Sequence, residues 1–166
     1  GPDCAFPSAE KTEALHNVDG VVGVSRYVTD YVRKWSGIEA IHVPISLMEP
    51  DSPADLGSIE NEFVTLVNPC AVKGISIFLE LAARMPTVKF AAVPTWGTNE
   101  ADQRALEARS NVTVLEPVDN IDELLARTSV LLVPSLWAEA RSRIIVEAML
   151  RGVPVLASDI GGIPEA

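Results

Sequence analysis

Residues 129–159, SVLLVPSLWAEARSRIIVEAMLRGVPVLASD, carry the pattern that determines the predicted fold of this chain. The stretch opens with a continuous apolar run at 129–135, which is typical of a strand buried on both faces. A helix is expected over 141–152, where Gly152 suits the position just after a helix C-terminus. A second apolar run follows at 153–159. Two such strands joined by a helix predict a parallel β-α-β unit.

The same alternation of apolar strands and helices begins near residue 61 and continues to the end of the sequence. Further strands are expected at 63–68, 88–94 and 112–116, with further helices at 73–85, 98–110 and 120–128. Five strands alternating with four helices predict a doubly wound α/β domain, Rossmann-like, with a parallel sheet covered on both faces. In such domains ligands bind beyond the carboxyl ends of the strands. The loops of interest are therefore 68–73, 94–99, 116–120, 135–142 and 159–163.

Single residues indicate where these helices begin, end and face the core. Thr98 or Asn99 is the expected cap of the helix at 98–110, and Asn120 is the expected cap at the start of the stretch 120–128. Pro86 is expected to end the helix at 73–85. The helical period of that segment directs four side chains toward the core: Ile77, Leu79, Leu81 and Ala82.

The first part of the sequence follows a different pattern. Residues 19–35 predict a strand that runs into a helix, and 38–46 predict another strand. One β-α-β piece cannot bury a sheet by itself. We therefore interpret residues 1–46 as the C-terminal remnant of a preceding domain. The polar, acidic, Pro-containing stretch 47–61 fits an interdomain linker, and 62–166 forms the main domain, truncated at its C-terminus.

Composition limits the classes of function. The chain has 166 residues, of which 48% are apolar, enough for a buried core. Its formal net charge of −10 argues against nucleic acid and against polybasic attachment to anionic lipid, because both need clustered Lys and Arg. Pro or charge interrupts every apolar run, and no signal peptide opens the sequence. A cytoplasmic protein without an integral membrane segment is the expectation.

Cysteine and histidine give no metal-binding pattern. Cys4 and Cys70 have no C-x-x-C partner, so their number excludes a structural zinc site and does not favour a disulfide framework. His16 and His42 also lack metal-like spacing. Surface or structural roles are expected for both histidines.

Glu139 and Glu147 frame the start of the expected helix at 141–152. On one continuous helix the two side chains would lie about 80° apart around the axis and about 12 Å along it. That spacing does not suit a shared metal, and alone it favours two solvated charges. If the helix begins near Ser142, Glu139 lies in the loop at the sheet edge and Glu147 in the second turn. The two carboxylates could then accept hydrogen bonds from hydroxyls on two parts of an elongated ligand, while helix N–H groups face phosphate oxygens.

Three stretches, 133–166, 67–86 and 19–46, together resemble the C-terminal half of the retaining GT-B glycosyltransferases of family 4 (glycosyl transferases group 1). The motifs that carry the resemblance are E-x7-E, G-V-P-V and G-G-x-P-E. The resemblance implies two Rossmann-like domains with an active site between them. It implies transfer of a sugar from a nucleotide-sugar donor with retention, without metal or other cofactor. The acceptor is not implied. Residues 62–166 would be the donor-binding domain and the first part a remnant of the acceptor-side domain.

The resemblance also implies roles for individual residues. Glu139 would be the catalytic residue, in contact with the transferred sugar, and Glu147 would hydrogen-bond the donor ribose. Lys73 would pair with the diphosphate, where a cation stabilises the developing negative charge. Without the resemblance, Lys73 and an aromatic such as Trp96 would be read as surface residues. The remaining donor-binding residues implied are Asn68, Trp96, Gly97, Thr98, Val118, Arg141, Ser142 and Arg143.

Two positions depart from the family pattern. The family usually carries an Arg five residues before the Lys, where this chain has Asn68. Between the glutamates it usually has Pro-Phe-Gly, where this chain has Ala140, Arg141 and Ser142. Ser142 adds a Cβ where close approach favours Gly, and Arg141 is a hypothetical replacement for the missing cation. These departures favour one alternative, a non-catalytic nucleotide- or sugar-binding module of the same fold. A GT-B sugar epimerase is a second alternative, although the additional acid/base groups that it would need are not visible in the sequence. The chain alone is expected to have little activity.

Overall fold

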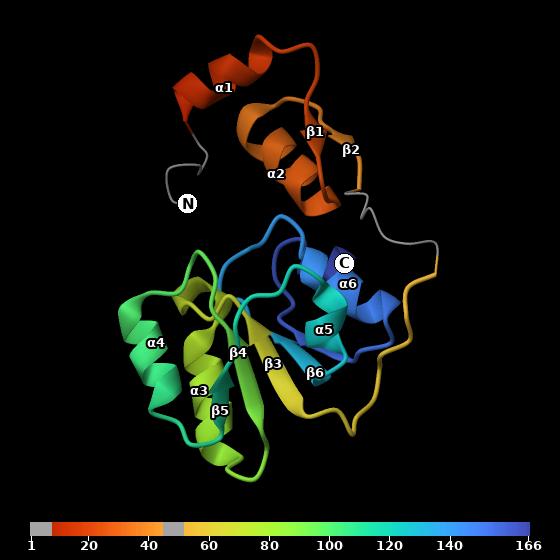
Figure 1. Cartoon of the computed structure of the whole chain (residues 1–166). Coiled ribbons are helices and arrows are strands. Elements are labelled where there is room, and N and C mark those ends of the chain that lie inside the picture. Colours follow the sequence, from red (N-terminus) through yellow and green to blue (C-terminus); the bar gives the residue numbers. More distant parts are fainter. Residues whose placement is uncertain (1–7, 45–51) are drawn as a thin grey trace.

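The computed structural model describes residues 8–44 and 52–166. Within them, a five-stranded parallel sheet has the order β5-β4-β3-β6-β7, and a smaller parallel sheet pairs β1 with β2 (Figure 1). The predicted α/β class with a parallel sheet is confirmed. The strands are β1 Val22–Gly23, β2 Ile41–His42, β3 Phe63–Val67, β4 Phe90–Val93, β5 Val112–Val114, β6 Thr128–Val133 and β7 Val155–Ala157.

Helices connect these strands in the predicted order. They are α1 Ala9–His16, α2 Arg26–Ser36, α3 Ile75–Arg84, α4 Glu100–Glu107, α5 Ile121–Leu125 and α6 Arg143–Leu150. In Figure 1, the carboxyl ends of β3, β4 and β6 point toward the part of the chain that contains α2. The loops predicted to carry a site therefore face that part.

Two apolar cores cover the two faces of the larger sheet. One core contains Phe78 and Ala82 of α3 together with Leu132 of β6. The other contains Ile145 of α6 together with Leu131 of the same strand. Neighbouring residues of β6 belong to opposite cores because successive side chains of a strand point to opposite faces. This double burial explains the continuous apolar run in the sequence.

Gly74 interrupts the helix that was predicted over 73–85. Its φ of 81° lies in the left-handed region, and it separates a 3-10 turn, Ala71–Lys73, from α3. The predicted helix start at Lys73 is therefore wrong. The prediction that Ile77 faces the core is also wrong. The buried face of α3 carries Ile75, Phe78 and Ala82, whereas Ile77 is exposed.

The other helix ends follow cap chemistry closely. The side chain of Asn99 accepts the N–H groups of Ala101 and Asp102, which starts α4, and Asn120 caps α5 through the N–H of Asp122. These confirm Asn99 rather than Thr98 as the cap. Gly152 has a φ of 72° after α6, as predicted for the residue that ends this helix.

Two segments differ from their predicted form. The sequence Ile-Pro-Glu-Ala at 163–166 predicts the start of a helix, but Ile163–Glu165 forms a 3-10 turn. Helix α1 was not predicted. Ser8 caps this helix by accepting the N–H of Lys11. None of the residues of α1 is buried, and its sequence has no apolar period from which a helix could be predicted.

Part of the predicted linker 47–61 lies outside the described residues, namely 47–51. The described part attaches to the main domain, because the N–H of Leu56 donates to the carbonyl of Arg151 at 2.9 Å. The Asn61 side chain donates to the carbonyls of Leu56 and Thr128. The domain boundaries themselves remain predictions. In the ranges 8–44 and 52–166, no helix is long and apolar enough to cross a membrane.

Candidate active site

Lys73 and Glu139 come together at the carboxyl edge of the sheet. Lys73 lies in the loop after β3 and Glu139 in the loop after β6, and these strands are hydrogen-bonded neighbours. The Lys73 Nζ is 2.7 Å from Glu139 Oε2, and the two side chains are only 20% and 7% exposed. The buried hydroxyl of Ser135 donates to the other oxygen of the same carboxylate. A cation and a carboxylate are thus held in direct contact at the predicted site.

A backbone hydrogen bond and close packing support this pair. The N–H of Leu136 donates to the carbonyl of Val72 at 2.9 Å, which joins the two loops next to the pair. Beneath them a cavity of about 20 Å³ is bordered by Lys73, Ser135 and Ser142, among apolar side chains of the sheet. The inner side of the site is therefore nearly filled.

Glu147 stands in the second turn of α6, whereas Glu139 lies in the preceding loop. The helix begins at Arg143, because Ser142 has extended backbone angles, φ −104° and ψ 106°. This placement agrees with the second of the two arrangements considered for the glutamates. The Glu147 carboxylate accepts from the Arg143 guanidinium at 3.3 Å and is mostly covered, with its side chain 14% exposed.

Asn68 links two loops of the site. Its φ of 58° is unusual for a residue with a side chain, and its Oδ1 accepts the N–H of Gly97 at 3.0 Å. A Cβ on Gly97 would lie 2.7 Å from that oxygen, so the contact requires glycine. Trp96, next to it, is 81% exposed. Asn68 therefore joins the loops after β3 and β4, and its amide oxygen already has a donor.

The remaining predicted residues differ in their surroundings. Arg141 is partly buried and, among the described residues, makes no ion pair, whereas Ser142 is buried and its side chain forms no cap hydrogen bond. The hydroxyl of Thr98 is buried without a hydrogen-bond partner in the described structure. Val118 is exposed. Lys73 and Arg143 are matched by carboxylates, so Arg141 is the one predicted cation of this edge that is left unpaired in the described ranges.

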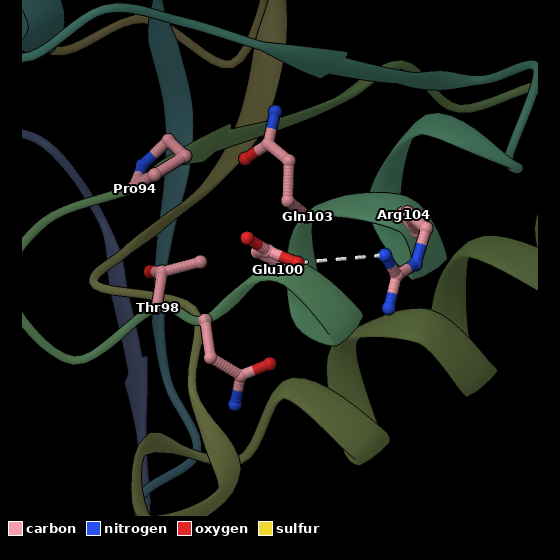
Figure 2. Close-up of a pocket in the computed structure, with 6 residues that line it drawn as sticks. Pro94, Thr98, Glu100, Gln103 and Arg104 are labelled. Atoms are coloured by element: carbon pink, nitrogen blue, oxygen red, sulfur yellow. Dashed lines mark ion pairs between the residues drawn. The ribbon is translucent and has the colours of Figure 1, made fainter.

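A surface pocket of about 400 Å³ lies beside the N-terminal end of α4 (Figure 2). Its lining residues are Pro94, Thr98, Asn99, Glu100, Gln103 and Arg104. Glu100 and Arg104 form an ion pair there at 3.7 Å. Of the predicted donor-binding residues, only Thr98 borders this pocket, so the pocket and the Lys73–Glu139 pair involve different residues.

Three supporting residues had not been predicted: Ser135, Asp122 and Arg151. The Arg151 guanidinium pairs with Asp122 and donates to the backbone carbonyl of Glu147 at 3.1 Å, so it supports the second turn of α6. Ser135 ends an apolar strand, and no sequence pattern marks it as the partner of a carboxylate. Across the described ranges there is no cluster of three or more His, Cys, Asp or Glu side chains that could hold a metal ion.

Comparison with known families shows to which family residues 63–166 are similar. The family model described as "Glycosyl transferases group 1" matches residues 63–166. The chain belongs to this family. A curated relative, an uncharacterized 42.6 kDa protein in the cps region of Klebsiella pneumoniae, is 27% identical over 152 residues. The alignment covers 90% of this chain and 40% of that protein.

Solved structures of other proteins show the same fold. Anabaena HepE, determined with UDP and glucose, has a TM-score of 0.74 and 22% identity, over 99% of this chain and 52% of its own. S. aureus TarM, determined in a complex that includes UDP, has a TM-score of 0.73 and 17% identity, over 99% of this chain and 35% of its own. The predicted GT-B fold is confirmed, and this chain of the glycosyl transferases group 1 family spans about half or less of the proteins that it matches.

Proposed function

We propose that this chain is the donor-binding part of a retaining, metal-independent glycosyltransferase that uses a nucleotide-sugar. The observation that carries the proposal is the Lys73–Glu139 pair at the carboxyl edge of the sheet, with Glu147 one helix turn away from the same loop. Membership in the glycosyl transferases group 1 family supports it. Anabaena HepE was determined with UDP-glucose, so uridine nucleotides are the first donors to test.

The proposed mechanism uses charge that is already in position. Departure of the nucleotide diphosphate develops negative charge, which a nearby cation stabilises. Lys73 would exchange its contact with Glu139 for the diphosphate oxygens. The Glu139 carboxylate would then accept hydrogen bonds from hydroxyls of the transferred sugar, while Glu147 would accept them from the ribose. The contribution of the protein is thus electrostatic and positional.

Arg141 is the proposed second phosphate cation. The family usually places an Arg where this chain has Asn68, and the amide oxygen of Asn68 is occupied by Gly97. Arg141 lies between the two glutamates and, in the described structure, makes no ion pair. A guanidinium without a carboxylate partner is free to bind a phosphate oxygen.

The test is a thermal-shift and calorimetric titration of this chain with UDP-, GDP- and ADP-sugars. One class of nucleotide should raise the melting temperature, because a ligand at 100 times its Kd adds about 2.7 kcal/mol of stability. Lys73→Ala should abolish most of the shift. Lys89→Ala is the control, because Lys89 is exposed and lies at the opposite end of β4. Absence of a shift with every nucleotide would contradict the proposal.

A non-catalytic binding module is the second candidate, favoured by the segment between the glutamates. Ser142 is buried, so its side chain occupies space that Gly would leave open. Both candidates predict nucleotide binding. Only the glycosyltransferase proposal predicts sugar transfer by a protein that has both domains of the GT-B fold. It also predicts that Glu139→Gln removes this transfer while nucleotide binding remains.

A further inference from the structure

Glu165 connects the end of the described chain to its first part. Its two carboxylate oxygens accept the backbone N–H groups of Arg26 and Tyr27, each at 2.7 Å. Both donors belong to the first turn of α2, where N–H groups have no partner within the helix and favour negative charge. Ser25, fully buried, accepts the N–H of Val28 at 3.2 Å and completes the cap. A distant side chain thus caps α2 together with its own N-cap residue.

Gly161 and Gly162, which precede Glu165 and are called here the glycine turn, are in direct contact with the loop that carries Glu139. The N–H of Gly162 donates to the backbone carbonyl of Glu139 at 2.7 Å. A Cβ on Gly161 would lie 2.6 Å from that carbonyl oxygen. A Cβ on Gly162 would lie 2.1 Å from the carbonyl oxygen of Ala140 and 2.9 Å from the hydroxyl of Ser25. Only hydrogens fit between the turn, the loop and the cap of α2.

These contacts form one continuous path. It runs from the N-terminal turn of α2 through Glu165 and Gly162 to the backbone of Glu139, and from the Glu139 carboxylate to Lys73. We propose that Glu165 is a positioning residue, which fixes the Glu139 loop by anchoring the glycine turn on α2. The part of the chain before the linker would thereby set the geometry of the donor site. For its effect on the donor, this inference rests on the proposed function.

The charge of Glu165 is part of the proposed contact. Partial burial raises the pKa of Glu165, but the hydrogen bonds from Tyr27 and Arg26 outweigh burial, and the net pKa lies below the ordinary 4.5. The charged groups of Arg26 and His42 also face this carboxylate and lower its pKa. Since the folded-state pKa is lowered, the contact is complete above pH 4.5 and weakens as the pH falls through the folded value.

The test compares Glu165→Gln and Glu165→Asp with the wild-type chain, and uses Glu60→Gln, at an exposed glutamate, as the control. Amide hydrogen exchange is measured at Arg26, Tyr27 and Gly162, alongside a UDP titration. Glu165→Gln should lower the protection of all three amides by about tenfold, as expected for hydrogen bonds to a charged group, and weaken UDP binding several-fold. Glu165→Asp keeps the charge on a shorter side chain and should give an intermediate loss.

Two outcomes separate positioning from simple capping. Wild-type protection of the Arg26 and Tyr27 amides should fall below pH 4.5, whereas in Glu165→Gln it should not depend on pH there. If the variant loses protection only at Arg26 and Tyr27, while Gly162 and the UDP affinity match the wild type, the positioning role is overturned. If wild-type chain binds no nucleotide, the proposed function fails, and the Gly162 amide still decides whether Glu165 acts on the loop.

Discussion

The ammonium of Lys73 lies 2.7 Å from the carboxylate of Glu139, across the two loops that follow β3 and β6. Both side chains are largely shielded from water, so each charge depends on the other for compensation. Under the proposed function, a phosphorylated ligand would have to compete with Glu139 for Lys73. The paired charges are therefore held in position by the fold, and under the proposed function donor binding would exchange one partner of Lys73 for another.

Removing Lys73 should destabilise the chain strongly. Lys73→Met leaves the Glu139 carboxylate without its cation, and the unfolding free energy should fall by about 3 kcal/mol. The double variant Lys73→Met/Glu139→Gln should recover part of the loss, because no unpaired charge remains. Urea denaturation of the single and double variants measures this coupling. If the single and the double variant lose the same unfolding free energy, Lys73 and Glu139 do not compensate each other's charge.

Asn68 should matter through its backbone angle as well as its side chain. Asn68→Gly and Asn68→Ala both remove the hydrogen bond to Gly97, but only Gly keeps the left-handed backbone angle accessible without strain. The free energy of unfolding of Asn68→Ala should therefore be about 1 kcal/mol lower than that of Asn68→Gly. Urea midpoints of the two variants give the comparison. Indistinguishable midpoints would contradict the role assigned to the backbone angle.

Gly162→Ala should destabilise the chain by at least about 2 kcal/mol, because its Cβ would overlap the carbonyl of Ala140. Gly20→Ala is the matched control, since nothing lies within 4 Å of a Cβ there. Thermal unfolding of both variants measures the difference. A tolerated Gly162→Ala would mean that the glycine turn can move away from the loop.

Arg141→Ala should weaken UDP binding by about tenfold or more and leave the unfolding free energy nearly unchanged, because no ion pair is lost. Arg109→Ala, at an exposed position near the end of α4, is the control. Calorimetric titration and urea denaturation provide the two readouts. If Lys73→Ala weakens UDP binding and Arg141→Ala does not, Arg141 is not the second phosphate cation.

The fold could be predicted from the sequence because its core strands are buried on both faces. Leu131 and Leu132 belong to opposite cores, and only a sheet covered on both sides accepts such a run. Asn99 and Asn120 could be recognised as caps because their side chains replace missing backbone partners. The sequence could not show that Gly74 would adopt a left-handed angle, so the start of α3 was misplaced.

The candidate residues could be proposed from the sequence, but their contacts could not. The loop position of Glu139 depends on where α6 begins, and Gly152 indicated where it ends. The contact of Lys73 with Glu139 depends on β3 and β6 being neighbours, which no local pattern reveals. The contact of Glu165 with α2 is equally long-range. The family resemblance supplied the roles, and the tertiary structure supplied the partners.

The adjacency of β3 and β6 has a consequence for how such a protein can diversify. After Lys73, the chain between β3 and β6 forms α3, β4, α4, β5 and α5, while β3 and β6 remain direct neighbours in the sheet. That segment can accept insertions, shortened loops or new side chains around Trp96 while the paired charges stay in register. The Lys73–Glu139 pair depends on the β3–β6 neighbourhood, whereas the loop around Trp96 does not contribute to that pairing. Substitutions in that loop could therefore change ligand preference while the paired charges stay in place.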